Sequence, residues 1–252
     1  MARSLVMISA GKCTAALAMA LGFVAQAMAA GSPTADLSRW VVEQMPGGTV
    51  TVRDGALEIR DKAGCTIWWK EKLTAPVEVE FTVKAIHGPS PSDRVSDVNC
   101  FWMAQENGSE DAPFSKGHAR TGRFAEYDSL FTYYVGYGAN NNTTTRFRRY
   151  DGTASRPLLP EHDLRDSRFM LTAGRPVRIR LVARDGMAEY WRDGERILHF
   201  KDPHPLEWGW FAFRTVKSHL RITDFLVVQG AKDAAEATST PAVLPPRGAG
   251  AR

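Results

Sequence analysis

The stretch Gly122–Gly152 (GRFAEYDSLFTYYVGYGANNNTTTRFRRYDG) carries the side chains best suited to chemistry on a sugar. It combines aromatic residues, the acidic pair Glu126 and Asp128, a Gly/Asn-rich turn and several arginines within one apparent hairpin. Aromatic rings stack on pyranose faces, and amide and guanidinium groups bind hydroxyls and carboxylates. The stretch therefore indicates a carbohydrate site more clearly than it indicates a reaction.

A polysaccharide lyase is the reaction that these residue types suit best. Such an enzyme neutralises a uronate carboxylate, removes the C5 proton and protonates the leaving oxygen. Arg146, Arg148 and Asn99 could hold the carboxylate, and Tyr134 or His118 could move the protons. Arginines beside Tyr134 would lower its pKa by favouring the phenolate. We therefore expect an anionic polysaccharide or oligosaccharide as the partner.

A glycoside hydrolase is the second alternative, because it needs two carboxylates across the scissile bond. Glu126 and Asp128 would share one strand face if their segment is extended, and Asp97 is a further carboxylate. The E-x-D-x-x-E pattern of glucanases is absent, since Phe131 stands three residues past Asp128. The hydrolase therefore ranks below the lyase.

A non-catalytic, lectin-like sugar-binding module is the third alternative, and it needs only aromatic platforms and polar side chains. Tryptophans could provide the platforms: Trp68, Trp69, Trp102, Trp191, Trp208 and Trp210. All three functions stay open, with the lyase preferred.

Other chemistry has little support in the sequence. It contains no C-x-x-C pair, no H-E-x-x-H, no Walker loop and no G-x-S-x-G elbow. No cofactor is expected, and the one metal that the Asp and Asn residues allow is a structural calcium ion without a legible ligand pattern. The formal net charge is +4, but basic and acidic residues are interspersed, so nucleic acid is not an expected partner.

The elements that must position these side chains are strands. Val77–Ala85 alternates apolar and polar residues with period two, and Val177–Leu181 does the same. Asp193-Gly194 separates two strand-like runs and predicts a tight hairpin. Further strands are expected at Thr49–Val52, Ala56–Arg60, Thr66–Lys70 and Leu220–Val228. Many short strands without an amphipathic helix of normal length predict an all-β sandwich or barrel.

The pleat of each strand predicts which side chains face outward. In Phe131–Gly138 the bulkier set should be core, which leaves Tyr134 outside. In 97–104 the apolar set ends with Ala104, which leaves Phe101 and Met103 outside. The same reasoning puts these candidates on one open face: Asn99, Tyr134, Arg146, Arg148 and Arg214. Asp97 and the turn residue Asn140 complete the substrate-binding candidates, and a bulge would invert any of these assignments.

Both ends of the chain differ in composition from its body. Residues 1–29 have a basic start, the apolar run Cys13–Val24 and an A-x-A site, which predicts a secretory signal peptide cleaved after Ala29. The run is too short to span a bilayer comfortably, so a membrane anchor is the weaker alternative. Residues 231–252 are rich in Ala, Pro and Gly and predict a disordered tail. We expect one domain over residues 30–230 in a secreted or periplasmic protein.

Two cysteines lie within the expected domain, Cys65 and Cys100. An exported protein could join them in a disulfide, or both could be buried free thiols on core strands. The sequence leaves both possibilities open.

Three blocks carry a resemblance to a known family. They are SDVNCFWMA (Ser96–Ala104), the longer block Arg120–Gly152 and GWFAFRTVKSH (Gly209–His219). They resemble the concanavalin-A-like jelly rolls of secreted bacterial carbohydrate-active proteins, and within these a YesU-related group of uncharacterised function. The resemblance implies a two-sheet antiparallel jelly-roll sandwich with a concave sugar-binding face. A fold does not fix a reaction, so the activity stays open.

Overall fold

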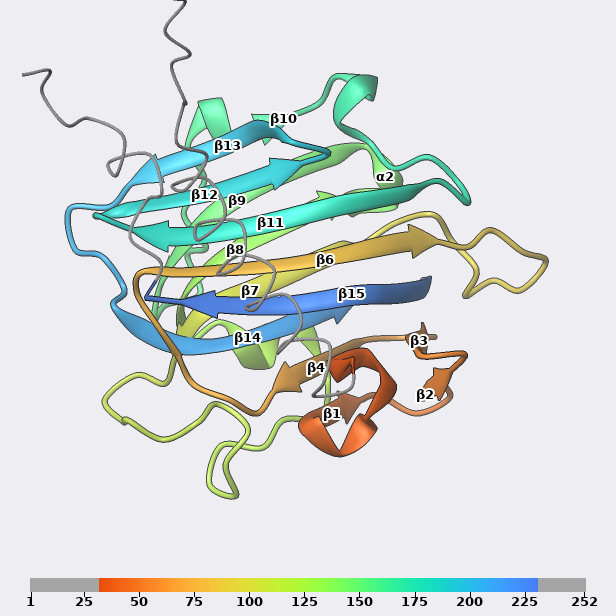
Figure 1. The fold of residues 1–252 in the computed structure, drawn as a ribbon, viewed down its shortest axis with the longest axis horizontal. Helices are drawn as coiled ribbons and strands as arrows, with labels where there is room; N and C mark the ends of the chain where they lie inside the picture. Colours follow the sequence, from red (N-terminus) through yellow and green to blue (C-terminus); the bar gives the residue numbers. More distant parts are fainter. Residues whose placement is uncertain (1–31, 231–252) are drawn as a thin grey trace, which may run out of the picture.

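Two antiparallel β-sheets stack face to face in the computed structural model, which describes residues 32–230 (Figure 1). The first sheet contains β1 (Trp40–Gln44), β4 (Cys65–Trp69), β5 (Leu73–Thr74), β7 (Val98–Gln105), β8 (Phe131–Gly138), β9 (Thr144–Asp151), β10 (Asp163–Leu164) and β14 (Trp208–Thr215). Its strand order is β1-β4-β14-β7-β8-β9-β10, with β5 paired to β14.

The second sheet contains β2 (Thr49–Arg53), β3 (Ala56–Arg60), β6 (Val77–Ala85), β11 (Pro176–Arg184), β12 (Met187–Arg192), β13 (Glu195–Lys201) and β15 (His219–Gln229). Its order is β13-β12-β11-β6-β15-β3-β2. The helical elements are single turns: η1 (Pro33–Ala35), η2 (Leu37–Arg39), η3 (Phe124–Tyr127), α2 (Ala139–Asn142), η4 (Pro160–His162) and η5 (Ser167–Phe169). The predicted all-β, two-sheet antiparallel sandwich is confirmed.

The core between the sheets follows from the alternation along each strand. On β6, Val77, Val79 and Phe81 point inward and are buried, while Glu78 and Glu80 lie outside. Burying the apolar side of every strand stabilises the fold by about 25 cal/mol for each Å² of apolar surface removed from water. The sequence marked the bounds of β3, β6 and β8 correctly but missed β1, a short strand at the sheet edge.

The two cysteines are buried in this core as free thiols, Cys65 on β4 and Cys100 on β7. Burial raises the pKa of both thiols, because an apolar environment disfavours the thiolate. Of the two alternatives that the sequence left open, the structure has free thiols.

A β-bulge near the end of β7 corrects one part of the pleat prediction. The register shifts between Trp102 and Gln105, and Met103 has a φ of +55°. Met103 therefore joins the core between the sheets, and Ala104 points to the outer side, the reverse of the prediction. A Cβ on Gly209 of β14 would lie 2.2 Å from the Met103 carbonyl carbon, so only glycine fits across from the bulge.

The turn between β8 and β9 is α2, where Asn140, Asn141 and Asn142 all have positive φ. Asparagine tolerates this left-handed region better than most residues do, which explains the Asn-rich sequence. No helix within residues 32–230 has the length and apolarity needed to cross a bilayer. The predicted signal peptide (1–29) and tail (231–252) lie outside the described residues.

Candidate functional site

The outer side of the first sheet is not the open face that the sequence predicted. The 106–130 connection between β7 and β8 packs on it and encloses a second aromatic cluster. The buried members are Trp68, Phe101, Ala104, Tyr127, Leu130, Tyr134, Tyr150, Trp210 and Ala212. The outward side chains of β4, β7 and β14 are too apolar to stay in water, so this part of the sheet needs a cover.

Glu43 and Arg120 hold the 106–130 connection in place. The buried Glu43 carboxylate accepts hydrogen bonds from Trp68 Nε1, Tyr127 Oη and the Arg120 backbone N–H, each 2.8 Å long. Arg120 also forms a 2.6 Å ion pair with Glu106 and donates to three carbonyl oxygens of its own connection. Burial raises the pKa of Glu43, although its three donors favour the charged form.

A pocket of 280 Å³ opens at the end of this covered face. It is lined by Arg94, Asp97, Asn99, Phe124, Tyr134, Ala139, Asn140, Asn141 and Val216. Four of the residues predicted for the site meet here, namely Asp97, Asn99, Tyr134 and Asn140. They come from β7, β8, α2 and the residue before β7. The connection after β6, which carries Arg94, lies at the same end of the sandwich as α2 (Figure 1).

Asp97 is a buried carboxylate in the pocket wall, only 8% exposed. Its Oδ2 accepts from Ser96 Oγ at 2.5 Å and from the Arg94 guanidinium at 3.1 Å. Its Oδ1 has only a 3.5 Å contact from Asn99 Nδ2. Burial raises the pKa of Asp97, and the Ser96 and Arg94 donors oppose that rise.

Asn99 and Tyr134 bring polar atoms without partners to the same pocket. Asn99 Oδ1 is fully buried and accepts no hydrogen bond within the described part of the chain. No hydrogen bond to Tyr134 Oη is formed by residues 32–230 either, and its ring packs 5.1 Å from Phe101 and 5.8 Å from Phe124. Most buried polar atoms in proteins have a partner, so the buried Asn99 Oδ1 indicates a place for a ligand.

The predicted lowering of the Tyr134 pKa is wrong. Tyr134 is 6% exposed, and burial raises its pKa well above the usual value. Arg214 and Arg148 favour the phenolate, but desolvation outweighs both. Tyr134 is therefore a neutral phenol at physiological pH.

The three predicted arginines lie near the pocket but are already engaged. Arg146 binds both carboxylate oxygens of Asp163, at 2.6 and 3.1 Å. Arg148 donates to the Arg156 carbonyl oxygen. Arg214 is buried among the aromatic rings and donates to the Gly122 carbonyl oxygen at 2.6 Å, while its Nε lacks a partner among the residues described.

The carboxylates predicted for a hydrolase do not share a strand face. Their segment forms the 3-10 turn η3 instead of a strand, because it belongs to the cover and not to the sheet. Glu126 accepts from the backbone N–H and hydroxyl of Thr121, and Asp128 binds Arg156 at 2.6 and 2.9 Å. His118 lies in the same connection, 4.0 Å from Glu106, and is not among the pocket lining.

Sequence reasoning missed Arg94, Asn141 and Val216 as pocket residues. Arg94 stands in the turn-rich segment SPSDRVSD, which has no periodicity from which a face could be inferred. Phe124 belongs to the stretch that drew attention first, although its position in η3 was not expected. Within residues 32–230 no three His, Cys, Asp or Glu side chains are placed to hold a metal ion, and a calcium site stays untested.

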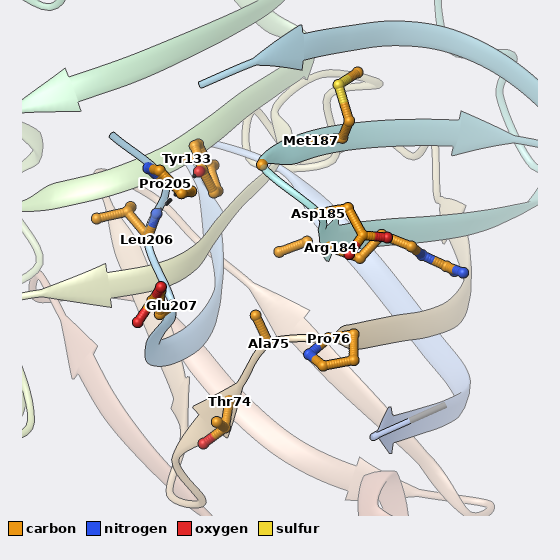
Figure 2. A pocket seen from close by; sticks show the side chains of 12 residues that line it. Thr74, Ala75, Pro76, Tyr133, Arg184, Asp185, Met187, Pro205, Leu206 and Glu207 are labelled. Atoms are coloured by element: carbon orange, nitrogen blue, oxygen red, sulfur yellow. Dashed lines mark hydrogen bonds between the residues drawn. The ribbon is translucent and has the colours of Figure 1, made fainter. Parts of the chain in front are cut away.

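A larger hollow of 430 Å³ lies elsewhere in the sandwich (Figure 2). Figure 2 shows Thr74, Ala75 and Pro76 on one side of it, with Tyr133 and Leu206 nearby. The Tyr133 hydroxyl donates to Asp202 at 2.9 Å and accepts from the Leu206 backbone N–H at 3.1 Å. Its buried hydroxyl is thus satisfied by the protein itself, unlike Asn99 and Tyr134 in the smaller pocket.

The family described as "Domain of unknown function (DUF6250)" matches residues 59–225. The chain belongs to the DUF6250 family. The match runs from within β3 into β15 and includes every residue that lines the candidate pocket. No curated protein matches the chain.

Several solved structures share the fold of this DUF6250 chain. A protein of unknown function with a galectin-like fold from Bacillus subtilis has 20% identity and a TM-score of 0.61, over 79% of this chain and 94% of that chain. The carbohydrate-binding module CBM66 from Bacillus subtilis has 8% identity and a TM-score of 0.51, over 75% and 94%. The metal-free carbohydrate recognition domain of Emp46p has 13% identity and a TM-score of 0.52, over 78% and 90%. These likenesses establish a galectin-like jelly-roll sandwich, while the narrower YesU-related grouping stays a prediction.

Proposed function

We propose that this DUF6250 protein binds a carbohydrate in the pocket formed by Asp97, Asn99, Tyr134 and their neighbours. One observation carries the proposal: Asn99 Oδ1 is buried without a hydrogen-bond partner, beside a buried carboxylate and aromatic rings. A buried polar atom without a partner costs about 1–3 kcal/mol, which a ligand hydroxyl would recover. Apolar walls with a few convergent polar groups are typical of small-molecule sites.

The similar structures support this proposal by analogy. One is described as a carbohydrate-binding module and another as a carbohydrate recognition domain, and both have the two-sheet sandwich. The predicted signal peptide at residues 1–29 is consistent with a glycan outside the cytoplasm. Fold analogy alone fixes no function, so the pocket geometry remains the main support.

The pocket geometry favours binding over cleavage. Asp97 is the only carboxylate among the lining residues, whereas hydrolysis usually needs two carboxylates across the scissile bond. The lining contains no histidine, and burial keeps Tyr134 protonated, so neither supplies a ready base for β-elimination.

Cleavage of a uronate-containing polysaccharide is the second candidate, and one observation favours it. Arg148 is paired in register with Tyr134, and Arg146 with Gly136, so both arginines lie on the strand next to the pocket. A uronate would have to displace Asp163 from Arg146 or the Arg156 carbonyl from Arg148. Absorbance near 235 nm would rise with uronate polysaccharides if the protein is a lyase and stay flat if it only binds.

Isothermal titration calorimetry against a panel of plant and microbial polysaccharides tests the main proposal. The variants are Asn99→Ala in the pocket and Asp185→Asn beside the larger hollow, which serves as the matched control. We expect Asn99→Ala to weaken binding about ten-fold or more, and the control to bind like the wild type. The proposal would be contradicted if no polysaccharide of the panel gave a heat of binding, or if Asn99→Ala bound as tightly as the wild type.

A further inference from the structure

We infer that the pocket selects a neutral sugar residue over a uronate, because the buried hydrogen-bonding groups that it leaves free are mainly acceptors. The inference rests on the proposed carbohydrate-binding function and names the class of sugar that the pocket takes. It also departs from the expectation of an anionic ligand, which came from counting arginines on one sheet face.

The one arginine that lines the pocket is already used by the protein. The Arg94 guanidinium donates to Asp97 Oδ2 at 3.1 Å and to the carbonyl oxygens of Val216 and Lys217 at 2.8 and 3.3 Å. It also donates to Asn141 Oδ1. These bonds tie Arg94 to four acceptors, so it has little capacity left to hold a ligand carboxylate.

The buried carboxamide and carboxylate oxygens that the pocket leaves to a ligand accept hydrogen bonds. Asn99 Oδ1 has no partner, and Asp97 Oδ1 has only the 3.5 Å contact from the Asn99 amide. Tyr134 Oη can donate or accept. A sugar hydroxyl donates to such oxygens, whereas a uronate carboxylate only accepts and would meet the Asp97 carboxylate as a like charge.

The other arginines near the pocket do not supply a hydrogen-bond donor for a ligand carboxylate either. Arg214 is 1% exposed, and its Cζ lies 5.3 Å from the Phe124 ring and 5.5 Å from the Tyr127 ring. It therefore sits among aromatic rings inside the cluster. Arg146 and Arg148 belong to β9 and are not part of the pocket lining.

One polymer in two chemical forms gives the sharpest test. A uronate polysaccharide is compared with the same polymer after carbodiimide activation and borohydride reduction, which converts each C6 carboxylate into a primary alcohol. Matched oligosaccharide pairs, such as those of galactose with galacturonate and glucose with glucuronate, are titrated in the same way at neutral pH. We expect the neutral member of at least one pair to bind about ten-fold or more tightly than its acidic partner.

Asp97→Asn should narrow the difference in affinity between the neutral and acidic members of a pair, because it removes the repelling charge and adds an N–H donor. Asparagine suits this position, where φ is +57°, so folding should be kept, and near-UV circular dichroism verifies it. Equal or tighter binding of the acidic members by the wild type would overturn the inference and leave carbohydrate binding intact. No binding of any member of any pair, nor of the polysaccharide panel, would overturn the proposed function and the inference together.

Discussion

The two sheets of this sandwich present opposite kinds of outer face. On the second sheet, charged side chains pair across neighbouring strands: Arg178 with Glu80, and Arg180 with Glu78 at 3.2 Å. On the first sheet, the outer side buries an aromatic cluster under the 106–130 connection and ends in a pocket with unpartnered polar atoms. Exposed ion pairs keep a sheet face soluble at little energetic gain, whereas buried polar atoms without partners are costly. The comparison therefore favours the first sheet as the location of the proposed ligand site.

The largest expected effect comes from removing the residue that holds the cover on the first sheet. Glu43→Ala leaves the Trp68, Tyr127 and Arg120 donors without an acceptor in a buried site. We expect the free energy of unfolding to fall by about 3 kcal/mol, measured by urea denaturation. Glu43→Gln, which keeps one acceptor oxygen, should lose less. A loss below about 1 kcal/mol for Glu43→Ala would show that the cover is held by its apolar contacts alone.

The next largest effect should appear in binding and not in stability. Tyr134→Phe removes a hydroxyl that bonds to no other residue of the range 32–230. The free energy of unfolding should change by less than about 1 kcal/mol. Glycan affinity should drop about ten-fold, because the ligand loses a hydrogen bond. Parallel calorimetry and thermal melts separate the two readouts. A variant that melts early but binds normally would make Tyr134 a packing residue of the aromatic cluster.

The pH dependence should distinguish the role of Asp97 in the pocket from that of Asp163 on β10, which pairs with Arg146. Burial raises the pKa of Asp97, so its carboxylate protonates at a higher pH than an ordinary aspartate. Arg146 lowers the pKa of Asp163, so its contribution to stability is present above the usual carboxyl pKa and is lost as the pH falls through the lowered value.

For Asp97 the sign is reversed, since protonation favours the folded protein while it removes the acceptor that a sugar hydroxyl needs. Glycan affinity should therefore decline on acidification before Asp163 weakens the fold. Titrations from about pH 7 to about pH 4 on the wild type and Asp97→Asn would show this. A pH-independent wild type, or an equal decline in Asp97→Asn, would remove Asp97 from the binding site.

The smallest effect is expected on the second sheet. The Arg178 side chain is 70% exposed where it pairs with Glu80, and exposed pairs of this kind contribute between about 0 and 1 kcal/mol. Arg178→Ala should change the free energy of unfolding by less than about 0.5 kcal/mol and leave glycan binding unchanged. A substantial loss of binding in calorimetry would mean that the second sheet also takes part in the function.

The fold was predictable because period-two alternation is a local signal. The strands β6 and β11 show it clearly, and the pleat of β7 correctly placed Asn99 outward. The bulge at Met103 was not predictable in the same way, because it depends on where Gly209 of another strand lies.

The site was predictable only in part, because contacts between distant segments decide which side chains bind one another and which stay free for a ligand. The sequence selected Asp97, Asn99, Tyr134 and Asn140, which do meet in one pocket. It could not show that Arg146 is bound by Asp163. It also treated the outward Phe101 as facing solvent, although so large an apolar side chain on a sheet face requires a cover. Whether the selected residues bind or cleave a glycan stays a prediction.

The most direct test of a glycan in this pocket is an NMR titration of the ¹⁵N-labelled protein with the tightest-binding oligosaccharide of the matched pairs. The side-chain amide signals of Asn99 and Asn140 report on the pocket, and that of Asn107, near Gly152, reports on a site outside it. Single-residue variants assign the three signals. We predict that the oligosaccharide shifts the Asn99 and Asn140 signals and leaves Asn107 in place. Binding that shifts other signals and leaves both pocket amides unchanged would contradict the assignment of the carbohydrate site.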